Sequence, residues 1–162
     1  MRPNGKSKSK MSEETTMSTE ESLRVVKDCY AAFGRGDIQG LLGMLSDDVE
    51  WHIPGEGLPL AGTSRGRDGV GQFFQKLSQD SDILAFEPRE FVAQDEQVAV
   101  IGWERVKVKA TNRTVEANWV MVFTVRGGKI ARFREFADTQ AFASAYASIH
   151  AATPKRMTIP IT

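Results

Sequence analysis

Hydrophobic and polar residues alternate along the stretch from Gln97 to Asp138, and this pattern predicts β-strands. The stretch contains three runs rich in β-branched and aromatic residues: VAVIGWERVKV, VEANWVMVFTV and KIARFREFAD. The short connections ATNRT and RGG separate them. Such connections between alternating runs are typical of β-hairpins. The sequence therefore predicts a three-stranded antiparallel meander.

The same alternation assigns side chains to the two faces of the predicted sheet, because successive strand residues point to opposite sides. In the middle run, Trp119, Met121 and Phe123 share one face. In the last run, Phe133 and Glu135 share a face. A carboxylate thus falls in phase with an aromatic residue on a face that looks apolar. Glu135 is therefore the first candidate functional residue.

Helical spacing of apolar residues dominates the N-terminal part of the chain and returns at its end. Ser18 and Glu21 form a capping-box pattern, so the first helix is expected to begin at Ser18. Glycines close this helix at residues 34–36. Further helices are expected around 38–45, around 70–77, and after Asp138 as far as Ile149.

Extended segments lie between these helices. The run VEWHI predicts a short strand that ends at Pro54, and residues 55–69 have the glycine-rich composition of a mobile rim or lid. Residues 83–93 form another extended run, in which Pro88 favours an edge strand or a bulge. Helices first and antiparallel strands afterwards indicate an α+β fold, with the helices on one face of a curved sheet.

Length and composition limit the possible functions. The 162 residues fit one domain, expected over 18–150, with a disordered tail at 1–17 and a C-terminal tail at 151–162. Lys plus Arg equal Asp plus Glu at 21 each, so no net field recruits nucleic acid or an anionic membrane. No apolar run approaches the roughly 18 residues of a membrane span. The single cysteine, Cys29, suits a reducing compartment, and we expect a cytoplasmic protein.

Three stretches between Tyr30 and Asp138 carry a family resemblance: AAFGRGDIQGLLGMLSDDVEWHIPG, GRDGVGQFF and RGGKIARFREFAD. They resemble the nuclear transport factor two-like superfamily, in its SnoaL-like, ketosteroid-isomerase-related branch. The resemblance implies a cone-shaped curved antiparallel sheet wrapped around three N-terminal helices and a pocket. A short C-terminal helix is expected in addition. The resemblance also implies a homodimer formed through the outer sheet face.

The catalytic residues of the ketosteroid isomerases do not recur at the matching positions. Their base aspartate corresponds to Ile53, and their protonated aspartic acid to Met121. Their tyrosine falls near Cys29, one residue before Tyr30. That mechanism needs a carboxylate base and two acidic donors, which isoleucine and methionine cannot supply. A standard ketosteroid isomerase is therefore not expected.

The limonene epoxide hydrolases offer a second set, an Asp-Arg-Asp group that positions water and protonates the epoxide. Arg105 and Glu135 match two of its members, but Lys107 stands in place of the first aspartate. A lysine there would change the proton transfer. Epoxide hydrolysis stays open.

SnoaL-type polyketide cyclases use acid/base residues in the same pocket, and a general form of their chemistry can be written here. Glu135, desolvated beside Phe133 and Trp119, would have a raised pKa and act as a general base. Arg105 would pair with it or hold an anionic substrate oxygen, and Tyr30 would donate a hydrogen bond to a carbonyl. In the alternative, Glu135 is a structural carboxylate paired with Arg105.

The expected ligand is a small hydrophobic molecule, because large apolar residues recur on the strands and the third helix. The residues expected to bind it are Trp51, Ile53, Phe73, Trp103, Trp119, Met121, Phe123 and Phe133. With His52 and His150 as the only histidines and no acidic cluster, neither a metal nor a cofactor is expected. Three classes remain: a cofactor-independent isomerase, cyclase or epoxide hydrolase, a non-catalytic binding protein, and a dimerisation module.

Overall fold

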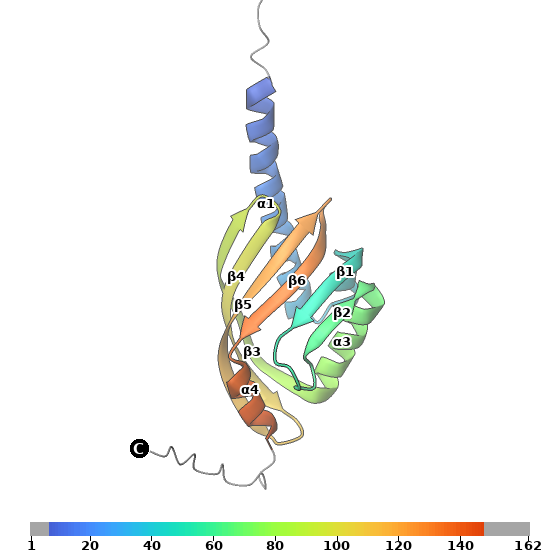
Figure 1. The fold of residues 1–162 in the computed structure, drawn as a ribbon, viewed down its shortest axis with the longest axis vertical. Helices are drawn as coiled ribbons and strands as arrows, with labels where there is room; N and C mark the ends of the chain where they lie inside the picture. Colours follow the sequence, from blue (N-terminus) through green and yellow to red (C-terminus); the bar gives the residue numbers. More distant parts are fainter. Residues whose placement is uncertain (1–6, 148–162) are drawn as a thin grey trace, which may run out of the picture.

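The structure is a computed structural model that describes residues 7–147, with side chains from residue 19 onward. Within these residues a curved six-stranded sheet carries helices against one face and a short helix near its end (Figure 1). The helices are α1 (Ser7–Gly34), α2 (Ile38–Gly43), α3 (Gly66–Asp80) and α4 (Thr139–Tyr146). The strands are β1 (Leu45–Ile53), β2 (Gly62–Arg65), β3 (Ser81–Gln94), β4 (Gln97–Val108), β5 (Arg113–Arg126) and β6 (Lys129–Ala137). The predicted α+β class is confirmed.

The strand order is β2-β1-β6-β5-β4-β3. The predicted meander is confirmed, because β4, β5 and β6 pair antiparallel in sequence order. The edge position of β3 and its register shift between Pro88 and Glu90 are also as predicted. One pairing differs from the antiparallel expectation, since β1 runs parallel to β6. A parallel pair needs a long connection between its strands, and the pattern within either strand cannot show it.

The structure differs from the sequence predictions in the start of the first helix and in one additional strand. Helix α1 begins at Ser7, not at Ser18, and no proline or glycine between these positions would stop it. The strand β2 lies inside the segment 55–69 that was expected to form only a rim, and it pairs antiparallel with β1. Its sequence, GTSR, is polar and exposed, so no apolar alternation indicates it. Residues 1–6 and 148–162 lie outside the described residues, so the tail at 151–162, the helix end at Ile149 and the disorder of the first residues stay predictions.

The core lies between the inner face of the sheet and helices α1, α2 and α3. Trp51 of β1 pairs in register with Phe133 of β6, which pairs with Phe123 of β5, so three aromatic residues cross the sheet in one row. Trp119 is 1% exposed. A Cβ at Gly102 would lie 2.2 Å from Trp119 Cζ2, so a glycine is needed where this indole packs against β4.

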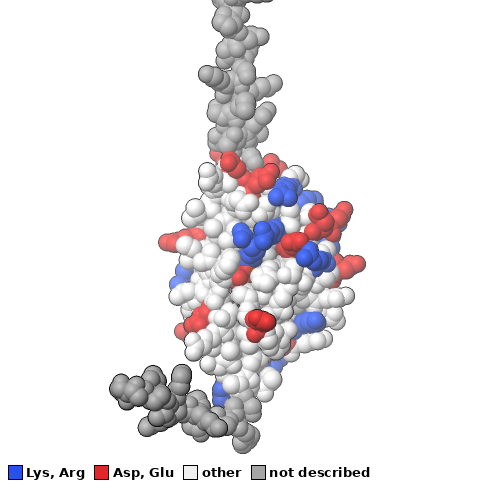
Figure 2. Space-filling view, in the orientation of Figure 1, with Lys and Arg blue, Asp and Glu red and all other residues white. Residues whose placement is uncertain are grey.

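The outer face of the sheet is more exposed and mixed in character. Ile101, Val120 and Phe136 lie in register across β4, β5 and β6, and Phe136 is 52% exposed. On the face that Figure 2 shows, basic and acidic side chains are interspersed among uncharged ones. The homodimer expected through the outer face stays a prediction. No helix among the described residues is long and apolar enough to cross a bilayer, and the cytoplasmic location also stays a prediction.

Candidate functional site

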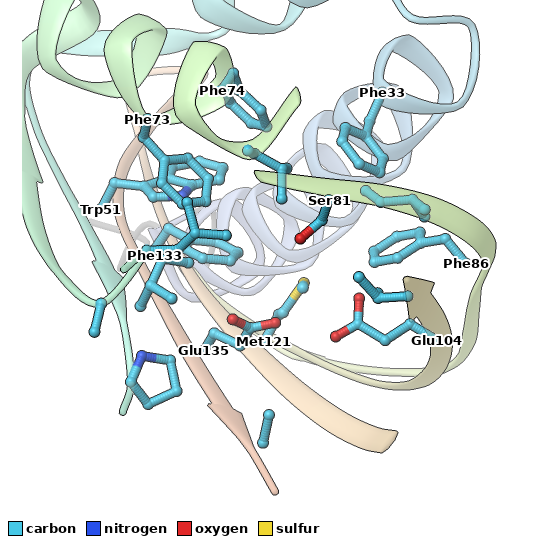
Figure 3. A pocket seen from close by; sticks show the side chains of 18 of the residues that line it. Phe33, Trp51, Phe73, Phe74, Ser81, Phe86, Glu104, Met121, Phe133 and Glu135 are labelled. Carbon is cyan, nitrogen blue, oxygen red and sulfur yellow. The ribbon is translucent and has the colours of Figure 1, made fainter. Parts of the chain in front are cut away.

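A cavity of about 140 Å³ lies between the inner face of the sheet and the helices α1, α3 and α4 (Figure 3). Its walls are mostly aromatic and aliphatic side chains. Segment 54–61, which connects β1 to β2, contributes Pro54, Leu58 and Leu60 to the lining. The side chains with polar atoms are fewer, and among the described residues they are Cys29, Tyr30, Trp51, Ser81, Glu104, Met121, Glu135, Thr139 and Tyr146.

Flat aromatic rings form two walls of this cavity. On one side Trp51 stacks on Phe133 with ring centroids 3.8 Å apart, and Phe73 packs beside Trp51. On the other side Tyr30 and Phe86 lie with ring centroids 6.0 Å apart. The rings come from β1, β6 and α3 on one wall and from α1 and β3 on the other. This shape suits a flat, apolar ligand.

Most of the predicted ligand residues line the cavity, and two do not. Those that line it are Trp51, Ile53, Phe73, Met121, Phe123 and Phe133, together with the proposed catalytic residues Tyr30 and Glu135. Trp119 is fully buried and does not line it. Trp103 lies on the outer face, where the Cζ atoms of Arg89 and Arg105 each lie 5.3 Å from the centroid of its ring.

Arg105 was expected in the cavity, beside Glu135 or a substrate oxygen, and this prediction is wrong. Its Nε donates to Glu116 Oε1 at 2.7 Å on the outer face, and its side chain is 45% exposed. Lys107, two residues on, also lies on this face, 3.8 Å from Asp82. The hypothesis of an ion pair between Arg105 and Glu135 is therefore wrong as well. The arginine that matches the epoxide-hydrolase set therefore does not line the cavity.

Glu104 is the residue that the sequence analysis missed. It is 8% exposed and lines the cavity, because even-numbered residues of β4 face inward. The alternation of β4 could have indicated this position, because Glu104 falls in phase with Val100 and Val106, which are both buried. Figure 3 shows the carboxyl groups of Glu104 and Glu135 pointing into the same space from β4 and β6.

These two carboxyl groups are held in an environment that disfavours their charged forms. Burial raises the pKa of Glu135 to about 7. Burial also raises the pKa of Glu104 to about 8, and the nearby Glu135 adds to this shift. Among the described residues that line the cavity, no Lys, Arg or His offers an opposite charge. Near neutral pH, Glu104 is therefore mainly protonated while Glu135 is about half ionised.

Tyr30 supplies a neutral donor to the same space. Its hydroxyl donates to Met121 Sδ at 3.3 Å, and a thioether is a weak acceptor. Burial raises the pKa of Tyr30 above its ordinary value, with the charges of Cys29 and Glu135 adding, so the hydroxyl keeps its proton. Its hydrogen bond to Met121 costs little to exchange for one to a ligand carbonyl.

His52 does not take part in this arrangement. Its Nδ1 lies 2.9 Å from Thr63 Oγ1 on β2, and the side chain is exposed outside the cavity lining. Within the described part of the chain, no group of three or more His, Cys, Asp or Glu side chains is placed to hold a metal ion. The site therefore consists of carboxyl, hydroxyl and aromatic groups.

Known proteins with a similar sequence or structure share this fold. Residues 26–133 match the family described as the SnoaL-like domain. An NTF2-like protein from Burkholderia xenovorans is 49% identical, with a TM-score of 0.73 over 78% of this chain and 96% of that one. The structure of TerC co-crystallised with polyporic acid is 31% identical, with a TM-score of 0.70 over 77% of this chain and 97% of that one. An uncharacterised protein of Mycobacterium tuberculosis is 31% identical over 120 residues, 74% of this chain and 91% of that one.

Proposed function

This chain belongs to the SnoaL-like domain family, and we propose that it is a cofactor-independent enzyme that moves a proton on a hydrophobic carbonyl compound. One observation carries the proposal. Glu104 and Glu135 enter an apolar cavity whose described lining holds no cationic side chain. Their raised pKa values keep one proton donor and one proton acceptor available together near neutral pH.

Each polar residue has a definite part in the reaction. The ionised Glu135 takes a proton from the carbon next to the carbonyl, and the electron pair of that C–H bond forms an enolate. The protonated Glu104 and the hydroxyl of Tyr30 donate hydrogen bonds to the enolate oxygen, where the negative charge develops. In an isomerase Glu135 returns the proton to another carbon. In a cyclase the enolate carbon attacks a second carbonyl of the same molecule.

The aromatic walls support a flat organic substrate, and one relative agrees with this. TerC, 31% identical to this chain, was crystallised with polyporic acid. Rings such as Trp51 and Phe133 would stack on a planar ligand and exclude water from the carboxyl groups. Epoxide hydrolysis that uses Arg105 is not proposed, because this guanidinium lies on the other face of the sheet.

Hydrogen–deuterium exchange tests proton transfer without knowledge of the natural substrate. The probe is 1-tetralone, a flat aromatic ketone, incubated in D₂O and followed by proton NMR at the carbon next to the carbonyl. We expect the wild type to exchange this position faster than buffer. Glu135→Gln should lose about 100-fold or more, and Glu104→Gln about tenfold to 100-fold. The matched control is Glu116→Gln, an exposed outer-face glutamate, and its rate should equal that of the wild type.

Ligand binding is measured on the same samples by quenching of tryptophan fluorescence, to which Trp51 in the cavity wall contributes. If 1-tetralone binds but exchanges no faster than in buffer, the protein is a binding protein and the enzymatic proposal fails. If Glu135→Gln exchanges as fast as the wild type, the base is another group.

A further inference from the structure

A cluster of three polar side chains lies where α3 ends and β3 begins. Ser81 Oγ donates to Asp80 Oδ2 at 2.6 Å, and the hydroxyl of Tyr146 donates to the same carboxylate oxygen. Ser81 and Tyr146 line the cavity, whereas Asp80 does not. The carboxylate therefore lies behind two hydroxyl groups and holds both of their protons. None of the reaction steps above uses these residues.

The direction of these hydrogen bonds determines what the cluster offers to the cavity. A hydroxyl has one proton and two lone pairs, and here both protons are committed to Asp80. The atoms left to contact a ligand are the lone pairs of Ser81 Oγ and of the Tyr146 hydroxyl. Burial raises the pKa of Tyr146 most, and the hydrogen bond and charge of Asp80 add to this rise. A hydrogen bond with Ser81 lowers the pKa without cancelling the rise, so the hydroxyl of Tyr146 stays protonated. The cluster therefore presents hydrogen-bond acceptors.

We propose that Ser81 and Tyr146, held by Asp80, form a second polar subsite that accepts a hydrogen bond from a hydroxyl group of the ligand. The inference rests on the proposed use of the cavity as a ligand site. It specifies the substrate class as a carbonyl compound that also carries a hydroxyl at its far end.

The register of the sheet places Ser81 and Glu104 at different levels along β4. Ser81 pairs with Val108, four residues along β4 from Glu104. At about 3.3 Å per residue, Val108 and Glu104 are separated by roughly 13 Å along β4. Figure 3 shows the Ser81 hydroxyl pointing into the space that Glu104 and Glu135 also face. A ligand that contacts both the subsite and the carboxyl groups therefore needs oxygen atoms at two separate positions.

The tyrosine of the subsite is held in place by further contacts of α4. Thr111 Oγ1 donates to the carbonyl oxygen of Ala145, and Arg113 donates to that of Ser144 at 2.9 Å. Thr111 belongs to the β4–β5 turn, and Arg113 is the first residue of β5. Because α4 keeps these contacts when the Tyr146 hydroxyl is removed, Tyr146→Phe tests the hydroxyl without releasing the helix.

The alternative is that Asp80 and Tyr146 only fasten α4 to α3. Such a latch is indifferent to the ligand, so its loss would weaken every ligand by the same factor. A subsite distinguishes ligands with and without a hydroxyl. The test therefore compares two ketones on each variant.

The probes are 6-hydroxy-1-tetralone and 1-tetralone, with Kd measured by tryptophan fluorescence. We expect the wild type to bind the hydroxyketone about five- to tenfold more tightly, the effect of one net hydrogen bond. In Ser81→Ala and Tyr146→Phe this preference should fall to about twofold or less. The matched control is Ser78→Ala, whose exposed hydroxyl bonds to the carbonyl oxygen of Gln75 on α3 and should leave the preference unchanged.

Equal affinities of the two ketones for the wild type overturn the subsite. So does a preference that survives in both variants, or an equal loss of affinity for both ketones, which is the result of a latch. Deuterium exchange recorded on the same samples separates this inference from the proposed function. A retained hydroxyl preference without exchange contradicts the enzyme but supports the subsite, and binding of neither ketone contradicts both.

Discussion

The inner and outer faces of the sheet treat the same kind of side chain in opposite ways. On the inner face, Glu104 is 8% exposed, and burial raises its pKa to about 8. On the outer face, Glu116 is half exposed and accepts a hydrogen bond from Arg105 at 2.7 Å. Arg105 directly follows Glu104 in the chain. One step along β4 therefore separates an uncompensated carboxyl group from a solvated ion pair.

The environment, and not the residue type, determines how readily a buried carboxyl group gives up its proton. A charge in an apolar cavity loses its hydration and gains nothing in return unless a cation lies nearby. An exposed ion pair keeps most of its hydration and contributes little. Near neutral pH the inner face therefore holds a protonated carboxyl group, whereas the outer face holds an ion pair in contact with solvent.

The largest difference between the two faces is expected in the loss of stability when Trp119 or Trp103 is replaced by alanine. Trp119→Ala should lower the free energy of unfolding by about 3–5 kcal/mol, because it removes a buried indole and leaves a cavity beside Gly102. Trp103→Ala should lower it by about 1 kcal/mol or less, because the outer indole mainly contacts two arginine side chains. Urea unfolding followed by circular dichroism measures both. Similar losses would mean that the outer face is also covered, as in a dimer.

A smaller effect is expected from Glu104→Gln, and it depends on pH. The folded-state pKa, about 8, lies above the ordinary value of 4.5, so the folded protein holds the proton more tightly. The contribution of Glu104 to stability is therefore full below about pH 4.5 and is lost as pH rises through about 8. The glutamine variant cannot ionise. It should match the wild type most closely near pH 5 and be more stable than the wild type by a few kcal/mol near pH 9.

Thermal unfolding across this pH range measures the difference, with Glu116→Gln as the outer-face control. The control curve should run parallel to that of the wild type, because Glu116 is exposed. Parallel curves for Glu104→Gln as well would contradict the uncompensated burial of Glu104.

The rate of deuterium exchange should show a narrow optimum in pH. Below about pH 7 the rate should fall, because Glu135 becomes protonated and cannot take a proton. Above about pH 8 it should fall again, because Glu104 loses the proton that it donates. Each limb should change about tenfold per pH unit, or about 1.4 kcal/mol.

The pH profile of Glu104→Gln tests whether the alkaline limb comes from the ionisation of Glu104. An amide still donates a hydrogen bond but does not titrate, so the alkaline limb should disappear while the acid limb remains. An unchanged alkaline limb would assign that ionisation to another group.

Local patterns in the sequence predict the meander, the helices and the inward position of Glu135. These features depend on residues that are neighbours in the chain, and the run from Ala131 to Ala137 keeps its alternation. The parallel pairing of β1 with β6 and the short strand β2 depend on distant partners, and no local period encodes them.

Glu104 was missed for a related reason. The alternation of β4 is regular, but Gly102 occupies an inward position where an apolar residue would be expected, and Trp103 beside it resembles a core residue. The glycine is required because the indole of Trp119 fills the space of its side chain. This contact joins residues on two strands and is visible only in the folded chain. The Asp80–Tyr146 bond likewise joins residues far apart in the sequence.

The smallest effect should come from the outer-face pair of Arg105 and Glu116. Both side chains are about half exposed, so their interaction is screened by water and salt. A double-mutant cycle with Arg105→Ala and Glu116→Ala should give a coupling of about 0.2–1 kcal/mol at low salt, and less in about 1 M NaCl. Urea unfolding of the four proteins measures it. A coupling of several kcal/mol that resists salt would mean that this face is desolvated, and the contrast with the inner carboxyl groups would then fail.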